Sequence, residues 1–162
     1  MSQKAVLLSI HPRYANAIFD GTKTVELRRR IPSLQAGDLV IVYVTSPVCE
    51  IQGVFTVESL ESGNIERLWR KVGSNSQVDY QDFKDYFDGL ESGFGIVIDE
   101  VFKLPRPTSL SAMRERNIQP PQGFRYLNQD DLKAFIGNGK RRKLSSHNTA
   151  QRRSQQDILV FP

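Results

Sequence analysis

The sequence contains little cysteine, little histidine and no long apolar run. Its single cysteine, Cys49, excludes both a disulfide within the chain and a zinc site built on cysteines. The two histidines, His11 and His147, are far apart in the sequence and form no local set of metal ligands. We therefore predict neither a metal nor a cofactor. No apolar stretch approaches the roughly 20 residues that span a bilayer, so we also predict no membrane partner.

The N-terminus lacks the features of a secretion signal. Its short apolar stretch ends at His11-Pro12 without a small-residue cleavage site and is typical of a first β-strand. This pattern predicts a cytoplasmic protein. The basic run at residues 140–143 matches the composition of a nuclear localisation signal, so we expect a nuclear location instead if the source is eukaryotic.

Positive charge is concentrated at the two ends of the chain. The formal net charge is +4, but residues 1–30 carry +4, residues 31–136 carry −5 and residues 137–162 carry +5. The C-terminal cations are Lys140, Arg141, Arg142, Lys143, Arg152 and Arg153. Because the surrounding residues are polar and small, we predict one domain over 1–136 and a flexible basic tail over 137–162. Such a tail adds salt-sensitive affinity for nucleic acid or, alternatively, only solubility.

Hydrophobic patterning predicts a mixed α+β domain. Strands are expected over residues 5–10, 24–30, 39–45, 49–59 and 93–104. Short helices are expected over residues 12–20, 65–72, 79–88, 109–116 and 128–136. Pro105 and Pro107 are predicted to end the last of these strands. Five or six strands with several short helices around them favour a small mixed β-barrel.

A short motif lies where the first helix is followed by the second strand. Residues Gly21–Arg28 read GTKTVELR and fit the pattern G-x-K-x-x-E-x-R. On a strand Glu26 and Arg28 point to the same face and can pair, and we expect Lys23, at the turn, to reach over that face as a mobile cation. Arginine offers paired donors and glutamate accepts from an amine, so this cluster suits a phosphate or a base edge. The alternative is an ordinary salt bridge on a polar face.

The motif and its surroundings resemble the ASCH family of PUA-like proteins. The preceding residues Leu8–Ala15 are similar to the strand and short helix that lead into the family's motif, and Pro120–Leu127 is similar to a later segment of ASCH proteins. The resemblance covers roughly residues 5–136. It implies a PUA-like barrel with a cleft beside the motif, which relatives use to bind RNA or a nucleobase.

The resemblance also implies two kinds of chemistry. Some small ASCH proteins look like amidohydrolases that remove the acyl group from N4-acetylcytidine, and others are linked to RNA cleavage. In the amidohydrolase branch the motif lysine is catalytic and a threonine stands where this chain has Glu26. Lys23 matches that branch and Glu26 departs from it, which weakens the amidohydrolase interpretation. Thr24 lies two residues away along the strand and cannot substitute without a different geometry.

We therefore predict a module that binds single-stranded RNA or a modified nucleoside. The residues expected to contact the ligand are His11, Lys23, Glu26, Arg28, Arg30 and Tyr43. Arg30 ends a run of three arginines suited to phosphates, and the alternative is a solvated strand edge. Tyr43 could stack on an unpaired base, although most aromatic residues of a small domain are core.

Two other functions stay open at this point. The first is a hydrolase that acts on RNA or a nucleoside through Lys23 and Glu26, since a lysine poised between charges can take part in acid–base chemistry. The second is a regulatory domain that binds a protein partner through its tail or its acidic middle.

Overall fold

The computed structural model describes residues 2–137, which fall into two compact units that divide after Leu127. The second unit, as far as it is described, is a helix over residues 129–137. Its N-cap is Asn128, whose Oδ1 accepts a hydrogen bond from the backbone N–H of Asp131 at 2.8 Å. The predicted basic tail lies, except for Gly137, outside the described residues.

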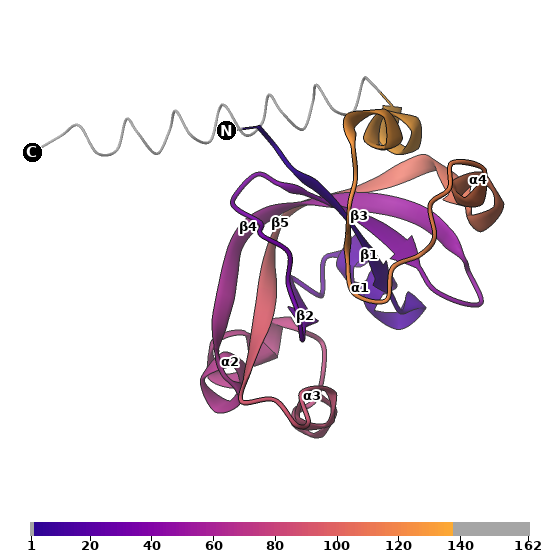
Figure 1. Ribbon diagram of the computed structural model, residues 1–162. Coiled ribbons are helices and arrows are strands. Elements are labelled where there is room, and N and C mark those ends of the chain that lie inside the picture. The colour runs from indigo at the N-terminus through magenta and orange to yellow at the C-terminus, as the bar shows by residue number, and fades with distance from the viewer. Residues whose placement is uncertain (1, 138–162) are drawn as a thin grey trace, which may run out of the picture. The chain divides into compact units, whose positions relative to one another are not determined.

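Six strands form one mixed sheet in the first unit (Figure 1). They are β1 (Ala5–Ile10), β2 (Val25–Arg28), β3 (Leu39–Val44), β4 (Glu50–Asn64), β5 (Ser92–Ser109) and β6 (Arg125–Tyr126). Their order in the sheet is β2-β5-β4-β3-β1-β6; β1 and β3 are parallel, and the other neighbours are antiparallel. The predicted α+β class and the number of strands are confirmed. Within the described residues the sheet is not closed, because β2 and β6 are its two edges.

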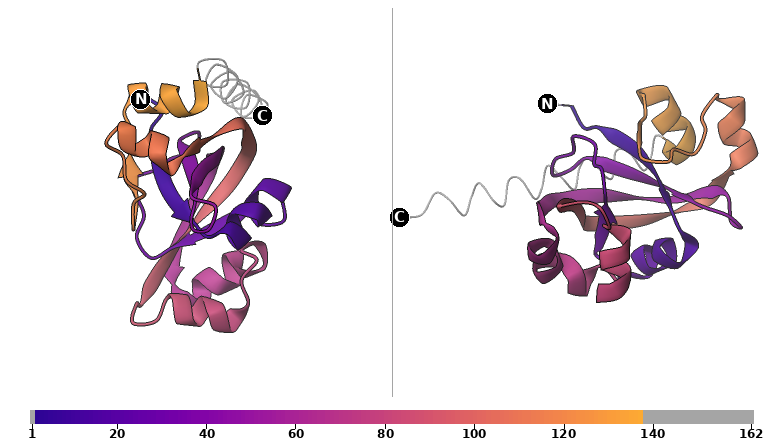
Figure 2. Two further views of the ribbon diagram at one scale, coloured as in Figure 1. Left: turned by 90° about the vertical axis from the view of Figure 1, so that its right-hand side faces the viewer. Right: turned by 60° about the horizontal axis from the view of Figure 1, so that its bottom comes forward.

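Short helices connect the strands of this unit. They are α1 (Pro12–Asp20), α2 (Ile65–Val72), the 3₁₀ helix η1 (Gly73–Asn75), α3 (Tyr80–Tyr86) and α4 (Leu110–Glu115). In Figures 1 and 2, α2 and α3 lie at one end of the long β4–β5 pair and α4 lies at the other. The segment from α2 to α3 is therefore an insertion between two paired strands.

The position of α1 follows from residues at its two ends. Pro12 occupies the first turn, where its missing N–H would have no helical partner. Gly21 ends the helix in the left-handed conformation with φ of 86°, which costs glycine little. Ala15 and Ile18 are buried against the sheet. The bounds predicted for this helix are confirmed.

Two apolar clusters lie on opposite faces of β2. One packs the sheet against α1 and contains, among others, Val6, Leu8, Ile10, Ala15, Ile18, Val40, Val42, Phe55 and Ile96. The other lies beneath α2 and α3 and consists of Val25, Leu27, Leu68, Val72, Phe83 and Phe87. Because side chains alternate along a strand, Val25 and Leu27 leave Glu26 and Arg28 on the face toward α1.

The two prolines near the end of β5 do not terminate it, so that prediction is wrong. β5 pairs with β4 as far as Gly53 opposite Lys103, and the pairing resumes with Ile51 opposite Thr108. Five steps along β5 thus oppose two steps along β4. Pro105 and Pro107 lie in this irregular stretch, where no ladder hydrogen bond is required of them.

Gly53 offers a test of how tightly β4 packs. A Cβ at this position would lie 2.3 Å from Cε1 of Phe19 and 2.7 Å from the carbonyl oxygen of Phe102. We expect Gly53→Ala to lower the free energy of unfolding by about 1–3 kcal/mol, because overpacking forces neighbours to move. Gly63→Ala, also on β4, is the matched control, since its nearest atom would be 3.6 Å away. Denaturant unfolding measures both, and equal midpoints for the two variants would contradict the packing described.

Candidate functional site

A pocket of about 220 Å³ opens beside the motif, between β1, β2, α1 and the segment that carries α3. The residues that line it are Ser9, Ile10, His11, Tyr14, Lys23, Glu26, Leu27, Arg28, Val78, Asp82 and Tyr86. Of the six residues predicted to contact a ligand, the structure brings together His11, Lys23, Glu26 and Arg28. The other two, Arg30 and Tyr43, do not line this pocket.

The backbone around Lys23 is held by three elements. The N–H of Lys23 donates to the carbonyl of Ala17 in α1 at 3.0 Å. The N–H of Thr24 donates to Asn75 of η1 at 2.9 Å, and the Thr24 carbonyl accepts from Ile98 of β5 at 2.9 Å. The residue before β2 is therefore fixed in position, and its side chain enters the protein.

The Lys23 side chain is buried, with 2% of its surface exposed, so the prediction of a mobile cation is wrong. Its Nζ donates to the carbonyl oxygen of Ser76 at 2.5 Å. The same atom lies 3.6 Å from Glu26 Oε2 and 5.0 Å from the centre of the Tyr14 ring. An ammonium group has three N–H donors, and 3.6 Å is longer than a direct hydrogen bond. The group can therefore still donate to a ligand in the pocket.

Burial lowers the pKa of Lys23 from its ordinary value, because the charged form loses water on entering the protein. The attraction of the Glu26 carboxylate acts in the opposite direction, without cancelling the effect of burial. Lys23 therefore loses its proton at a lower pH than an exposed lysine does. Such an amine can accept a proton as well as donate a hydrogen bond.

Glu26 and Arg28 form the pair expected from their spacing, with 3.6 Å between Oε1 and Nη1. Arg28 also donates from Nη1 to the carbonyl of Ser9 at 3.4 Å and from Nη2 to the carbonyl of Gly123 at 2.7 Å. Its guanidinium therefore ties the segment around Gly123 to the pocket wall. Each carboxylate oxygen of Glu26 lies 3.6 Å from a cation, Oε2 from Lys23 and Oε1 from Arg28, which is longer than a direct hydrogen bond. Both oxygens can therefore still accept hydrogen bonds from a ligand.

His11 lies at the entrance to α1 and is exposed. It caps that helix, because its Nδ1 accepts from the backbone N–H of Arg13 at 3.2 Å. In the neutral ring this leaves the hydrogen on Nε2, which is then a donor. The ring also meets Tyr14 edge-on, with centroids 6.1 Å apart. His11 therefore combines a structural role with a place on the pocket wall.

Seven of the eleven residues that line the pocket were not predicted as site residues, and among these Tyr14, Asp82 and Tyr86 bring aromatic or charged groups to it. The two tyrosines lie in the helices predicted over residues 12–20 and 79–88, where an aromatic residue is typical of a buried face. Asp82 and Tyr86 are four residues apart and so share one face of α3, which is the only local signal that links them. The hydroxyl of Tyr86 donates to the carbonyl of Leu27 at 3.2 Å, and this bond joins α3 to β2.

The remaining predicted residues lie elsewhere. The strand predicted over residues 24–30 ends at Arg28, so Arg29 and Arg30 follow it as exposed residues. Tyr43 is buried in β3 with 4% exposed, where burial and a hydrogen bond with Cys49 raise its pKa to about 12. A ligand-binding role for Arg30 and Tyr43 stays a prediction. The six cations of the tail lie outside the described residues.

Within residues 2–137, no three His, Cys, Asp or Glu side chains are grouped so that they could hold a metal ion. None of the helices described there is both long enough and apolar enough to cross a membrane.

Comparison with known proteins agrees with this geometry. The model of the ASCH domain matches residues 8–102, which is more than half of the chain and includes the motif. The chain belongs to the ASCH family. An ASCH domain-containing ribonuclease of Zymomonas mobilis is 31% identical over 136 residues, covering 83% of this chain and 91% of that protein. The crystal structure of ASCH from Zymomonas mobilis has a TM-score of 0.77 and 31% identity, covering 82% of this chain and 93% of that one.

A second relative is the large ribosomal subunit protein uL22 of Ureaplasma parvum. It is 30% identical over 125 residues, and the match covers 76% of this chain but 39% of that protein. These comparisons show the family and its PUA-like fold. What the pocket binds follows from the side chains that line it.

The burial of Lys23 predicts a particular dependence of stability on pH. In the unfolded chain this lysine titrates near 10.5, and in the folded protein its pKa is lower. Between these two values the unfolded chain binds more protons, so the stability that Lys23 contributes rises with pH and levels off above 10.5. We expect the free energy of unfolding of the wild type minus that of Lys23→Met to rise with pH through this window.

Chemical denaturation of both proteins at several alkaline pH values measures this difference. Every other titrating group is common to the two chains, so its direct contribution cancels. A difference that stays flat or falls with increasing pH would show that the lysine is not held in a buried position.

Proposed function

We propose that this ASCH protein binds single-stranded RNA by taking one nucleotide into the pocket beside the motif. The observation that carries the proposal is the buried ion pair of Lys23 and Glu26, which lines an open pocket of about 220 Å³. That volume is below the roughly 300–1,000 Å³ of sites for drug-sized ligands and suits a single base with its sugar.

The chemistry of the pair fits a base edge. Glu26 can accept from an exocyclic amine, and Lys23 can donate to a neighbouring carbonyl or ring nitrogen. Tyr14 and Tyr86 add aromatic surface from two different helices, which suits the stacking of an unpaired base. The charged residues that line the pocket are two cations, Lys23 and Arg28, and two carboxylates, Glu26 and Asp82, so recognition there rests on hydrogen bonds and stacking and not on net charge.

The C-terminal cations have a separate part in the proposal. Residues 137–162 carry a charge of +5 and would add affinity that is independent of sequence and falls with salt. The pocket would instead determine which nucleotide is preferred. Salt dependence therefore separates the two contributions.

Removal of Lys23 tests the binding proposal. We expect Lys23→Met to weaken binding of a labelled mixed-sequence single-stranded RNA roughly tenfold or more, because hydrogen bonds to charged groups contribute more than neutral ones. Fluorescence anisotropy over a salt series measures the affinity. The matched control is Lys71→Met, since Lys71 forms an ion pair with Glu61 at 2.6 Å but does not line the pocket.

An equal loss in both lysine variants would show that only charge in general matters. Unchanged affinity in Lys23→Met would overturn the proposal. Failure of the wild type to bind any RNA or nucleoside would favour the interpretation as a protein-binding regulatory domain.

Cleavage of RNA is the second candidate function, and two observations favour it. The Zymomonas mobilis relative is named as a ribonuclease, and Lys23 has a lowered pKa inside an open pocket. In this reaction the neutral Lys23 amine takes the proton of a ribose 2′-hydroxyl, and the oxygen forms a bond to the adjacent phosphorus. The bond from phosphorus to the 5′-oxygen then breaks, and that oxygen is protonated by water or by His11. The products carry a 2′,3′-cyclic phosphate and a 5′-hydroxyl.

The cleavage candidate makes a prediction about pH. Glu26 raises the pKa of Lys23, so Glu26→Gln should move the rising limb of the rate–pH profile to lower pH. Lys23→Met should abolish cleavage, and Lys71→Met should retain it. Product ends are identified by mass spectrometry, and N4-acetylcytidine incubated in parallel tests the amidohydrolase alternative. Products that persist in Lys23→Met would exclude this mechanism. Binding without products would exclude cleavage and support the binding proposal.

A further inference from the structure

The segment from Pro121 to Gly123 is bonded to two residues that line the pocket. Ser9, which lines the pocket, donates from Oγ to the carbonyl of Pro121 at 2.7 Å. Arg28, which also lines it, donates to the carbonyl of Gly123 at 2.7 Å. Two pocket residues therefore hold Pro121 and Gly123 in place, and the chain then runs away from the pocket along β1, where Tyr126 lies opposite Val6.

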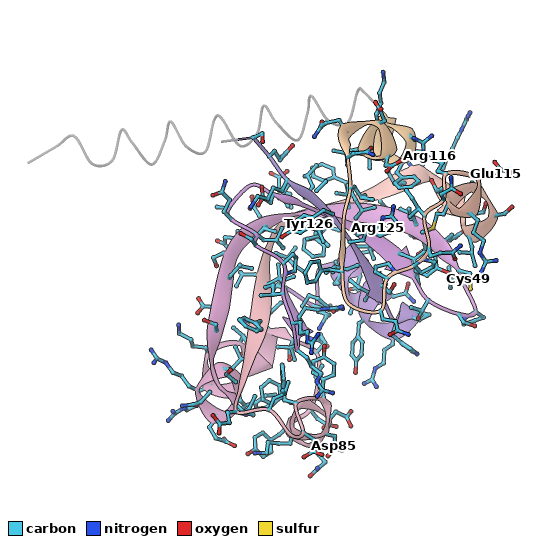
Figure 3. All side chains as sticks on the ribbon, in the orientation of Figure 1. Cys49, Asp85, Glu115, Arg116, Arg125 and Tyr126 are labelled. Carbon is cyan, nitrogen blue, oxygen red and sulfur yellow. The ribbon has the colours of Figure 1, made fainter. Side chains whose placement is uncertain are left out.

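Tyr126 is the most exposed large hydrophobic residue of the described chain, with 49% of its surface open. It lies on the edge strand β6 and is labelled with Arg125 in Figure 3. The Phe124 ring meets it edge-on, with centroids 5.7 Å apart, and Phe124 itself packs on the core. The Tyr126 hydroxyl accepts from the backbone N–H of Ser33 at 2.9 Å. The ring is thus fixed at both ends while much of it remains open.

Two cations, Lys4 and Arg125, lie close to Tyr126. Lys4 donates from Nζ to the carbonyl and the hydroxyl of Ser33 at 3.1 and 3.3 Å, so the ammonium group and the Tyr126 hydroxyl are bound to the same residue. None of the ion pairs found among residues 2–137 involves Lys4 or Arg125. The nearby Asp38 carboxylate is buried and accepts from the backbone N–H groups of Lys4 and Gln35. An exposed aromatic ring beside a cation that forms none of these ion pairs suits a base with its phosphate.

We propose that Tyr126, supported by Phe124 and flanked by Lys4, is a stacking platform for the nucleotide next to the one in the pocket. This inference rests on the proposed function and extends it from one nucleotide to a strand. Tyr126 lies three residues beyond Gly123, which Arg28 binds, so at most about 11 Å of chain separates it from the pocket wall. Tyr126 does not line the pocket itself, and this separation brings its ring within reach of the adjacent nucleotide.

The experiment compares a mononucleotide with a longer strand. Tyr126→Ala should weaken binding of a labelled single-stranded RNA oligonucleotide roughly tenfold, because the stacking of one base is lost. Its affinity for a ribonucleoside monophosphate should not change. Tyr126→Trp should restore binding of the oligonucleotide, since indole also stacks. Isothermal titration calorimetry measures both ligands.

Tyr80→Ala is the matched control. Tyr80 is 43% exposed, its hydroxyl makes one hydrogen bond to Glu66, and its ring contacts Trp69, but it does not line the pocket. Lys4→Gln supplies a second measurement that leaves Tyr126 intact. It should reduce the slope of log affinity against log salt concentration by about 0.7.

The outcomes separate this inference from the proposed function. Loss of oligonucleotide binding in Tyr126→Ala but not in Tyr80→Ala, with restoration by tryptophan, supports the platform. Unchanged oligonucleotide binding in Tyr126→Ala, while Lys23→Met still weakens it, overturns the platform and leaves the pocket. An equal loss for the monophosphate and the oligonucleotide overturns it as well. A wild type that binds neither ligand removes both proposals.

Discussion

The ion pair of Lys23 with Glu26 is the interaction on which the pocket depends. An ammonium group taken out of water loses several kcal/mol of hydration, which its new partners must offset. Here the carbonyl of Ser76 and the carboxylate of Glu26 provide that compensation. Ser76 directly follows η1, Glu26 belongs to β2 and Lys23 follows α1, so the charge is compensated only when all three elements are in place. The pocket is therefore assembled together with the insertion that carries α2 and α3.

The strand β2 meets two opposite requirements with only four residues. Val25 and Leu27 complete the apolar cluster beneath α2 and α3, while Glu26 and Arg28 line the pocket. A slip of one residue would exchange these sets, exposing two apolar side chains and burying two charges in an apolar cluster. The antiparallel pairing with β5 and the contacts of Lys23 prevent such a slip. The two-residue spacing of Glu26 and Arg28 is therefore required both for the packing of β2 and for the lining of the pocket.

Local features of this chain could be predicted from sequence, and contacts across long separations could not. Gly21 ends α1 because glycine adopts a left-handed conformation readily, and Asp79 begins α3 because its side chain accepts a hydrogen bond from the first turn. The pairing of Glu26 with Arg28 follows from strand alternation alone. The burial of Lys23 depends on Ser76, 53 residues away, and no local pattern records that contact. The continuation of β5 through Pro105 could not be predicted for a similar reason. Only the pairing of β4 with β5 shows that no hydrogen bond is needed there.

Glu26 determines how the buried lysine can be used. A threonine at this position would offer a hydroxyl but no charge. Glutamate instead raises the pKa of Lys23 against the effect of burial and so extends the pH range in which the ammonium form persists. The charged form binds an anionic strand or donates to a base, whereas only the neutral form can take a proton. One carboxylate therefore shifts the same lysine toward its ammonium form, on which the proposed binding of RNA depends, and moves any proton abstraction to higher pH.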